Sequence, residues 1–215
     1  KKVFKVFISG LARSGTTALL NQIFSSNKFG SLKYSHMPFI LNPRLSEIFS
    51  SISKKGEIKS QERIHQDGIN ININSPECLD EPFWIKENPN YFSEEINTNR
   101  KYNIETLENY DKLLTRHSIF QDKNKFIIKN NNNHLRIPQL CNFFKNDLFI
   151  ILFRDPLSHS FSLQNTHNKI CIAQKNDPFI LDYMNLIGHR EFGLNQKPFN
   201  YGKNKSLTES IFDSK

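Results

Sequence analysis

Three short apolar runs along the chain predict buried β-strands. They are rich in β-branched and aromatic residues, and they cover residues 3–8, 126–129 and 148–153. The last run, LFIILF, contains no polar residue. A central parallel strand is apolar throughout because helices cover both faces of its sheet, so we expect residues 148–153 to form such a strand.

Apolar residues recur at helical spacing between and after these runs. The pattern predicts helices over residues 16–24, 43–52, 76–85, 104–120, 134–144, 156 to about 167, and 178–190. The segment 63–75 is polar with alternating isoleucines, which favours an edge strand or a lid-like loop. Residues 193–215 are polar and only weakly patterned.

The alternation of strands and helices predicts an α/β chain with a three-layer, P-loop-like fold, in which helices flank a central parallel sheet. A length of 215 residues suits a single domain, and we expect residues 1–215 to form one. Ligands of such sheets bind beyond the carboxyl ends of the strands. The loops that follow Ile8, Lys129 and Phe153 should therefore converge on one site.

The chain carries a formal net charge of +8, and its sequence pI is near 9.3. This balance favours anionic partners, such as a nucleotide with several phosphates or an acidic acceptor. The basic residues are dispersed and show no RNP-like or zinc-finger-like pattern, so we do not expect nucleic-acid binding. No apolar run reaches the roughly 18 residues of a membrane span. The pattern does not indicate an oligomeric state.

The three cysteines, Cys78, Cys141 and Cys171, are far apart in the sequence and odd in number. No CxxC pair or mixed Cys/His cluster indicates a zinc site. Free thiols are typical of a reducing compartment, so we expect a cytoplasmic protein. The start, KKVFKVFISG, is too short for a signal peptide, and the missing initiator Met leaves the loss of an earlier segment open.

The segment GLARSGTT, residues 10–17, stands between a predicted strand and a predicted helix. Backbone N–H groups at such a junction bind anions together with the helix N-terminus. Gly10 and Gly15 have the spacing of the glycines in a P-loop. The segment therefore predicts a phosphate-binding loop, with an ordinary strand-to-helix turn as the alternative.

This loop differs from that of nucleotide triphosphatases in its cation. Thr16 stands where those enzymes carry Lys, and Arg13 supplies a positive charge three residues earlier. Those enzymes also need an acidic partner for Mg²⁺. Asp155 is the one candidate at a strand end, and Pro156 follows it directly. The loop therefore indicates an anion site that differs from a Mg-ATP site.

Two motifs together resemble those of the PAPS-dependent sulfotransferases, which use 3′-phosphoadenylyl sulfate as donor. The family's 5′-phosphosulfate loop carries (R/K)-S-G-T-T after an N-terminal strand, as residues 13–17 do here. Its 3′-phosphate site has an apolar strand, an Arg and a Ser eight residues later, which here are Arg154 and Ser162. The resemblance extends over residues 3–170. The segments YSHMPFIL, HQDGI, SPECLDEPFW and GHREFG also resemble a group of bacterial sulfotransferases.

The resemblance implies transfer of a sulfuryl group from PAPS to a hydroxyl or amine, with PAP as the product and without a metal ion. Arg13 is then expected to hold the phosphosulfate and stabilise its developing charge, and Arg154 to hold the 3′-phosphate. The expected donor-binding residues are Arg13, Ser14, Gly15, Thr16, Thr17, Arg154 and Ser162. A small molecule, a glycan and a tyrosine side chain all stay open as acceptors. Family members are usually longer, so we expect part of the C-terminal region to be missing.

An acceptor hydroxyl must lose a proton as it attacks, so we expect a general base near the loop. Cytosolic sulfotransferases carry Lys-x-His after the strand that corresponds to residues 126–129, where this chain has Lys129, Asn130 and Asn131. The resemblance assigns the leaving oxygen to Lys129, but Asn131 cannot act as a base. Tyrosylprotein sulfotransferases take their base from a segment about twenty residues after the loop Arg, which makes His36 our first candidate.

His65 and Asp67, in the segment HQDG, are the second candidates for the base and could instead grip the acceptor. We interpret the other nearby polar and aromatic residues as structural. We expect a solvated helix face for Glu77, Asp80 and Glu81. Phe83 and Trp84 are expected in the core, with stacking on adenine or on a phenolic acceptor as the alternative. For His167, His189 and Glu191 we expect surface or capping positions, with contacts to the acceptor as the alternative.

Two other functions stay open on the sequence. A P-loop kinase-like phosphotransferase would share the loop, but Thr16 and the lack of a clear Mg²⁺ partner argue against it. A non-catalytic nucleotide-binding module would keep the loop and lack either the base or a C-terminal lid.

Overall fold

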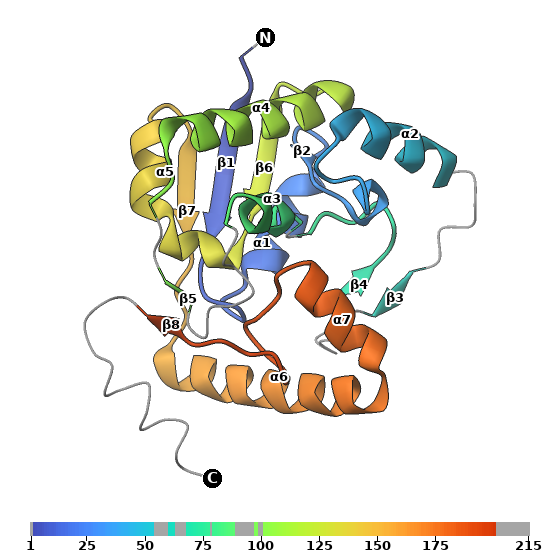
Figure 1. The fold of residues 1–215 in the computed structure, drawn as a ribbon, viewed down its shortest axis with the longest axis vertical. Helices are drawn as coiled ribbons and strands as arrows, with labels where there is room; N and C mark the ends of the chain where they lie inside the picture. Colours follow the sequence, from blue (N-terminus) through green and yellow to red (C-terminus); the bar gives the residue numbers. More distant parts are fainter. Residues whose placement is uncertain are drawn as a thin grey trace.

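A four-stranded parallel sheet with the strand order β2-β6-β1-β7 lies at the centre of the computed structural model (Figure 1). Its strands are β1 (Phe4–Ser9), β2 (Gly30–Ser31), β6 (Lys125–Lys129) and β7 (Leu148–Ile151). The structure describes residues 2–53, 60–62, 68–77, 79–88, 97–98 and 101–200. Outside the sheet, β3 (Gln61–Glu62) is antiparallel to β4 (Asn70–Ile71), and β5 (Asn97–Thr98) is parallel to β8 (Phe199–Asn200).

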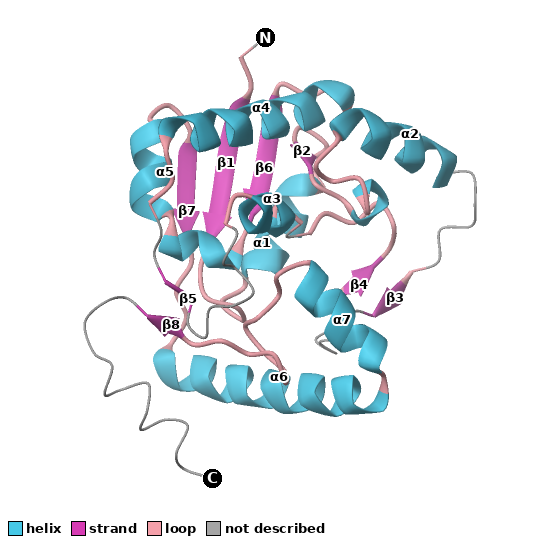
Figure 2. Cartoon of the chain, in the orientation of Figure 1, coloured by secondary structure: helices cyan, strands magenta, loops and turns pink. Residues whose placement is uncertain are grey.

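Helices flank the sheet and connect its strands (Figure 2). They are α1 (Thr16–Phe24), α2 (Pro43–Ser53), α3 (Glu81–Lys86), α4 (Ile104–Phe120), α5 (Ile137–Phe143), α6 (Pro156–Asn176) and α7 (Pro178–Leu186), with 3-10 turns η1 (Tyr34–His36) and η2 (Asn131–Leu135). The predicted bounds of α1 and α4 match the structure, whereas α6 is longer than predicted and α3 is shorter. Within the described ranges, no helix is long and apolar enough to cross a membrane.

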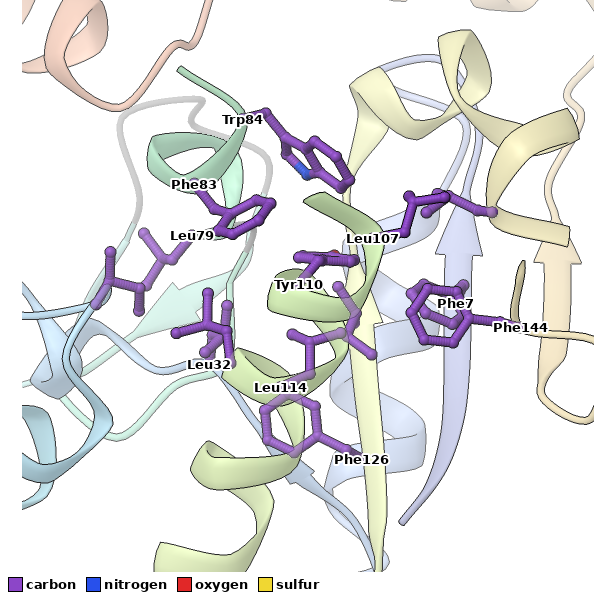
Figure 3. Close-up of a cluster of buried hydrophobic side chains, with 14 of the residues drawn as sticks. Phe7, Leu32, Leu79, Phe83, Trp84, Leu107, Tyr110, Leu114, Phe126 and Phe144 are labelled. Carbon is purple, nitrogen blue, oxygen red and sulfur yellow. The ribbon is translucent and has the colours of Figure 1, made fainter. Parts of the chain in front are cut away.

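Alternate residues of the central strands build a core on each face of the sheet. Phe7 packs with Phe126 and with Tyr110 of α4 in one cluster (Figure 3). Val6 packs with Leu20 of α1 in another cluster. Because neighbouring residues of a strand point to opposite faces, α4 and α1 cover opposite faces of the sheet. The expected three-layer α/β arrangement is confirmed.

Strand β7 lies at the edge of the sheet in the described part of the chain, so the expectation that residues 148–153 form a central strand is wrong. Leu148 and Ile151 are 48% and 42% exposed, whereas Ile8 of β1 and Ile127 of β6 are fully buried. An apolar run shows that a strand is hydrophobic on both faces, but it does not show which neighbours the strand has. Strand β1 is central because it pairs with both β6 and β7.

The register of the sheet brings three strand ends together. Ile8 of β1 lies opposite Lys129 of β6 and Ile150 of β7. The chain segments that follow these three strands therefore leave the sheet on the same side, at the carboxyl ends of the strands, as the sequence predicted.

A buried polar cluster contradicts the solvated helix face expected for Asp80 and Glu81. Their exposed fractions are 1% and 2%. Asn130 Nδ2 donates to Asp80 Oδ1 at 3.0 Å and to Glu81 Oε2 at 2.8 Å, and Arg136 Nη1 donates to Glu81 Oε2 at 3.0 Å. Burial raises the pKa of Asp80. The two carboxyl groups are buried because polar partners that are distant in sequence meet them in the interior.

The two aromatic residues of α3 and two of the cysteines are placed by the structure. Phe83 and Trp84 are buried in the core, as expected. Cys141 and Cys171 are free thiols. Cys78 lies outside the described residues.

Candidate active site

The loop between β1 and α1 is shaped by its glycines and by Arg13. Arg13 and Gly15 have positive φ angles of 71° and 96°, and Gly15 directly precedes α1. A Cβ atom on Gly10 would lie 2.6 Å from Ser14 Oγ and 2.8 Å from the carbonyl oxygen of Leu152. Glycine is therefore required at position 10 by close packing and favoured at position 15 by its φ angle.

The start of α1 offers polar groups to a ligand. The first N–H groups of a helix have no intrahelical acceptor, and the helix dipole favours an anion beside them. Ser14 is 8% exposed, and its Oγ has no hydrogen-bond partner among the described residues. A buried hydroxyl without a partner costs free energy, so Ser14 fits a site whose ligand supplies that hydrogen bond.

Helix α6 is attached directly to this loop. Arg13 Nε donates to Ser162 Oγ at 3.2 Å, and Arg154 Nη1 donates to the carbonyl oxygen of Arg13 at 3.2 Å. One turn before Ser162 on α6, His159 Nε2 contacts the carbonyl oxygen of Ala12 at 2.7 Å. The two sequence motifs, which are more than 130 residues apart in the sequence, therefore lie side by side.

Asp155 is engaged at the start of α6. Its carboxylate accepts a hydrogen bond from the N–H of Ser158 at 2.8 Å, and this hydrogen bond lowers the pKa of Asp155. Asp155 is therefore an N-cap residue of the usual kind. Within the part of the chain that the structure describes, no three His, Cys, Asp or Glu side chains gather as a possible metal site.

A cavity of about 630 Å³ opens beside the loop. Its lining includes all loop and α1 residues from Ala12 to Ala18, residues after β6, the β3–β4 pair and one side of α7. Figure 1 shows α7 beside β3 and β4, on the side of the molecule where the sheet strands end. Cavities of this size typically bind small molecules.

Lys129 ends β6 in the wall of this cavity. Its Nζ lies 3.0 Å from Glu77 Oε1, and the exposed fractions of the two side chains are 6% and 13%. Tyr34 OH donates to Glu77 Oε2 at 3.5 Å. An ammonium group and a carboxylate therefore lie together in the cavity wall, at the carboxyl ends of the strands, where the loop between β1 and α1 begins.

A series of hydrogen bonds joins the loop to the segment after α7. Thr16 Oγ1 donates to Asn131 Oδ1 at 3.2 Å, and Asn131 Nδ2 donates to Glu191 Oε1 at 3.1 Å. His189 Nδ1 lies 3.2 Å from Glu191 Oε2. Burial disfavours the charged carboxylate, but His189, the residue's own backbone, Lys129 and Asn131 together lower the pKa of Glu191.

His36 lies in the interior and does not line the cavity. Its exposed fraction is 0%. The N–H of Lys33 donates to Nδ1 at 3.2 Å, so Nε2 carries the ring proton and faces Glu47 Oε1 at 3.1 Å. The ring centroid lies 5.1 Å from that of His117. Both ring nitrogens of His36 are therefore used in packing η1 against α2 and α4.

Three lining residues that we interpreted from the sequence as structural are Glu77, His189 and Glu191. The solvated or surface positions expected for the two glutamates are wrong, since their side chains are 13% and 7% exposed. Both lie in segments, SPECLDEPFW and GHREFG, whose wording resembles bacterial sulfotransferases, and this was the signal that could have identified them. His65 and Asp67 lie outside the described residues.

Comparison with known proteins adds one finding to this geometry. A family model described as the sulfotransferase family matches residues 5–177. Searches of curated proteins and of solved structures found no match. The matched range contains the loop of residues 10–17, Lys129, Arg154 and Ser162, and it covers most of the chain. The chain therefore belongs to the sulfotransferase family.

Proposed function

We propose that this protein transfers a sulfuryl group from PAPS to an acceptor hydroxyl. The observation that carries the proposal is the meeting of the loop and α6, where Arg13, Arg154 and Ser162 lie within one hydrogen-bonded group. A donor with a 5′-phosphosulfate and a separate 3′-phosphate needs two anion sites near each other, each with a planar arginine fork.

The residues present fit such a donor. Gly10 leaves no room for a side chain, and Ser14 Oγ is buried without a partner among the described residues. We assign the phosphosulfate to the loop amides with Arg13, Ser14, Gly15, Thr16 and Thr17. We assign the 3′-phosphate to Arg154 and Ser162. When bound, PAPS supplies an activated sulfuryl group whose S–O bond to the 5′-phosphate breaks during transfer.

Lys129 has the position and charge to stabilise the departing oxygen. It is 6% exposed and ends β6 opposite Ile8, directly before the loop. A fixed ammonium group in a site shielded from water stabilises developing negative charge more strongly than water does. We therefore keep for Lys129 the role that the family resemblance suggested.

Glu77 is our proposal for the general base. His36 is enclosed by protein and its two ring nitrogens face Lys33 and Glu47, whereas Glu77 lines the cavity 3.0 Å from Lys129. The acceptor oxygen bonds to sulfur as its proton passes to the Glu77 carboxylate, and the products are a sulfate ester and PAP. His189 also lines the cavity, and its contact with Glu191 makes it the second candidate.

Two observations argue against a kinase-like function. Thr16 at the position of the P-loop Lys donates to Asn131, and Asp155 at the end of the strand caps α6. Calorimetry with PAP in the presence of EDTA tests the proposal, and we expect tight binding that Mg²⁺ does not change. Binding of ATP that requires Mg²⁺, with no binding of PAP, would show a phosphotransferase instead. PAP binding without transfer of labelled sulfate to any acceptor would show a non-catalytic module.

A further inference from the structure

The side of α7 that faces the cavity is apolar. Ile180, Met184 and Ile187 follow one another at helical spacing and line the cavity. Phe179 and Tyr183 add two aromatic rings whose centroids lie 6.2 Å apart with nearly parallel planes. Phe179 is 70% exposed and borders the cavity, so its ring continues the apolar side of α7 toward solvent.

The β3–β4 pair contributes a second apolar surface to the same cavity. Ile69 and Ile71 both line it. Ile71 belongs to β4 and Ile69 directly precedes this strand, so the apolar contribution comes from both sides of Asn70. The donor site makes no use of them. The acceptor wall, as we name it, consists of Ile69, Ile71, Ile180, Tyr183, Met184 and Ile187.

The charges around the acceptor wall disfavour an anionic ligand. The described lining carries the carboxylates of Glu62, Glu77 and Glu191. Two of its basic side chains already face a carboxylate, since Lys129 Nζ lies 3.0 Å from Glu77 and His189 Nδ1 lies 3.2 Å from Glu191. The two arginines of the described lining belong to the proposed donor site. An acceptor with its own carboxylate or sulfate would therefore lose hydration beside like charges.

Tyr183 connects the acceptor wall with the proposed base. Burial raises the pKa of Tyr183, and the charge of Glu77 raises it further. Tyr183 and Glu77 both line the cavity, so the acceptor wall and the proposed base face the same space. A hydroxyl compound on the acceptor wall would share this cavity with the carboxylate that we propose as the base.

We infer that the acceptor is an uncharged small molecule whose hydroxyl group sits on an apolar aliphatic or aromatic skeleton. The inference rests on the proposed function and narrows it. Apolar skeletons gain free energy from leaving water for the acceptor wall, whereas the carboxylates of Glu62, Glu77 and Glu191 in the described lining repel a polyanionic glycan or an acidic tyrosine peptide. A cavity of about 630 Å³ has the size of a small-molecule site.

Matched ligand pairs test the inference by calorimetry on the full chain loaded with PAP. Octan-1-ol is compared with 8-hydroxyoctanoate, and 4-propylphenol with 3-(4-hydroxyphenyl)propanoate. We expect the neutral member of at least one pair to bind roughly tenfold more tightly or better than its anionic partner. The pair with the tighter neutral member tells an aliphatic from an aromatic skeleton. Equal binding within both pairs, or preference for the anion, overturns the inference.

The variant Ile71→Lys tests the location, with Ile71→Leu as the matched control. We expect Ile71→Lys to weaken octan-1-ol roughly tenfold and to strengthen 8-hydroxyoctanoate, while PAP affinity and the melting temperature stay close to those of Ile71→Leu. Unchanged ligand preference in a folded Ile71→Lys protein contradicts the assigned wall.

The two proposals fail separately. Lack of PAP binding to the wild-type protein refutes the donor assignment, and the same ligand pairs titrated without PAP still measure the acceptor preference. PAP binding together with binding of an acidic tyrosine peptide or a sulfated oligosaccharide, and of no neutral compound, refutes the acceptor class alone.

Discussion

Arg13 Nε donates a hydrogen bond to Ser162 Oγ at 3.2 Å, although 149 positions separate the two residues in the sequence. Arg13 lies in the loop before α1, and Ser162 lies on α6 after β7. The contact exists because β1 and β7 are parallel neighbours whose ends reach the same edge of the sheet. It joins the two halves of the proposed donor site.

This relationship leads to a prediction for donor binding. Arg13→Ala and Arg154→Ala should each weaken PAP binding by about 1.5–3 kcal/mol, because each removes charge-assisted hydrogen bonds. Ser162→Ala should cost less, about 0.5–1.5 kcal/mol. Calorimetry on the single variants and on Arg13→Ala/Ser162→Ala measures the coupling between the two side chains. Unchanged PAP affinity in both arginine variants would refute the proposed donor site.

Glu77→Gln should reduce turnover by roughly 10²–10⁴-fold, because the amide cannot accept the acceptor proton. PAP affinity should remain within a few-fold of the wild-type value, since we place Glu77 outside the donor site. Transfer of labelled sulfate to the best neutral acceptor gives the rate, and Glu77→Asp is the control that keeps a carboxylate. Full activity in Glu77→Gln combined with loss of activity in His189→Asn would assign the base to His189.

His36→Ala should act on stability. The substitution removes the acceptor of the Lys33 N–H and the partner of Glu47 from the interior, at a cost of about 1–3 kcal/mol. Urea unfolding measures this loss, and the rate per folded molecule should change little. A variant of normal stability that has lost turnover would return the role of base to His36.

His117 should make the protein less stable in acid. Burial lowers its pKa from 6.5 to about 4, although its hydrogen bond to the Ile40 carbonyl works in the opposite direction. Below pH 6.5 the unfolded chain therefore takes up a proton that the folded protein does not, and the free energy of unfolding falls as the pH falls. The loss should approach about 3 kcal/mol at pH 4, since one pKa unit corresponds to about 1.4 kcal/mol.

Urea unfolding between pH 8 and pH 4 measures this loss. The control is His117→Gln, which keeps a donor for the Ile40 carbonyl and has no titrating ring. The difference between the two stability curves isolates His117 from His36, Glu47 and Lys33, whose charges also act on it. Parallel curves for the two proteins would contradict the prediction.

Arg136→Ala should lower the stability of the folded protein. Arg136 is 5% exposed and donates to the buried carboxylate of Glu81. Removal of one partner from a buried ion pair typically costs about 3–5 kcal/mol. The double variant Glu81→Leu/Arg136→Met leaves neither charge buried and should recover part of that loss. Thermal unfolding of the wild type and the two variants measures these changes. An Arg136→Ala protein with the stability of the wild type would show that the ion pair does not contribute to stability.

The proposed donor side of the site was predictable from short stretches of residues. Gly10, Arg13, Gly15 and Thr16 lie within one loop, and their spacing is enough to predict a strand, an anion loop and a helix in this order. The bounds of α4 were also predictable, because its apolar residues repeat at helical spacing.

Packing between distant segments governed the rest of the site. Glu77 faces the cavity because the backbone pairs Pro76 with Lys33, which brings Glu77 beside Tyr34. His36, three residues after Lys33, is instead enclosed by α2 and α4. No local pattern distinguishes these two outcomes, since both residues are polar and lie in irregular segments.

Residue patterns were thus enough for the fold class and for a glycine loop between a strand and a helix, because the alternation of elements and the spacing of glycines are short-range properties, while the expectation that Arg13 and Arg154 share one site came from the resemblance to sulfotransferases. The edge position of β7, the burial of His36 and the entry of Glu77 and Glu191 into the cavity emerged only in three dimensions. These features depend on which surfaces exclude water together, and that is a property of contacts between segments far apart in the chain.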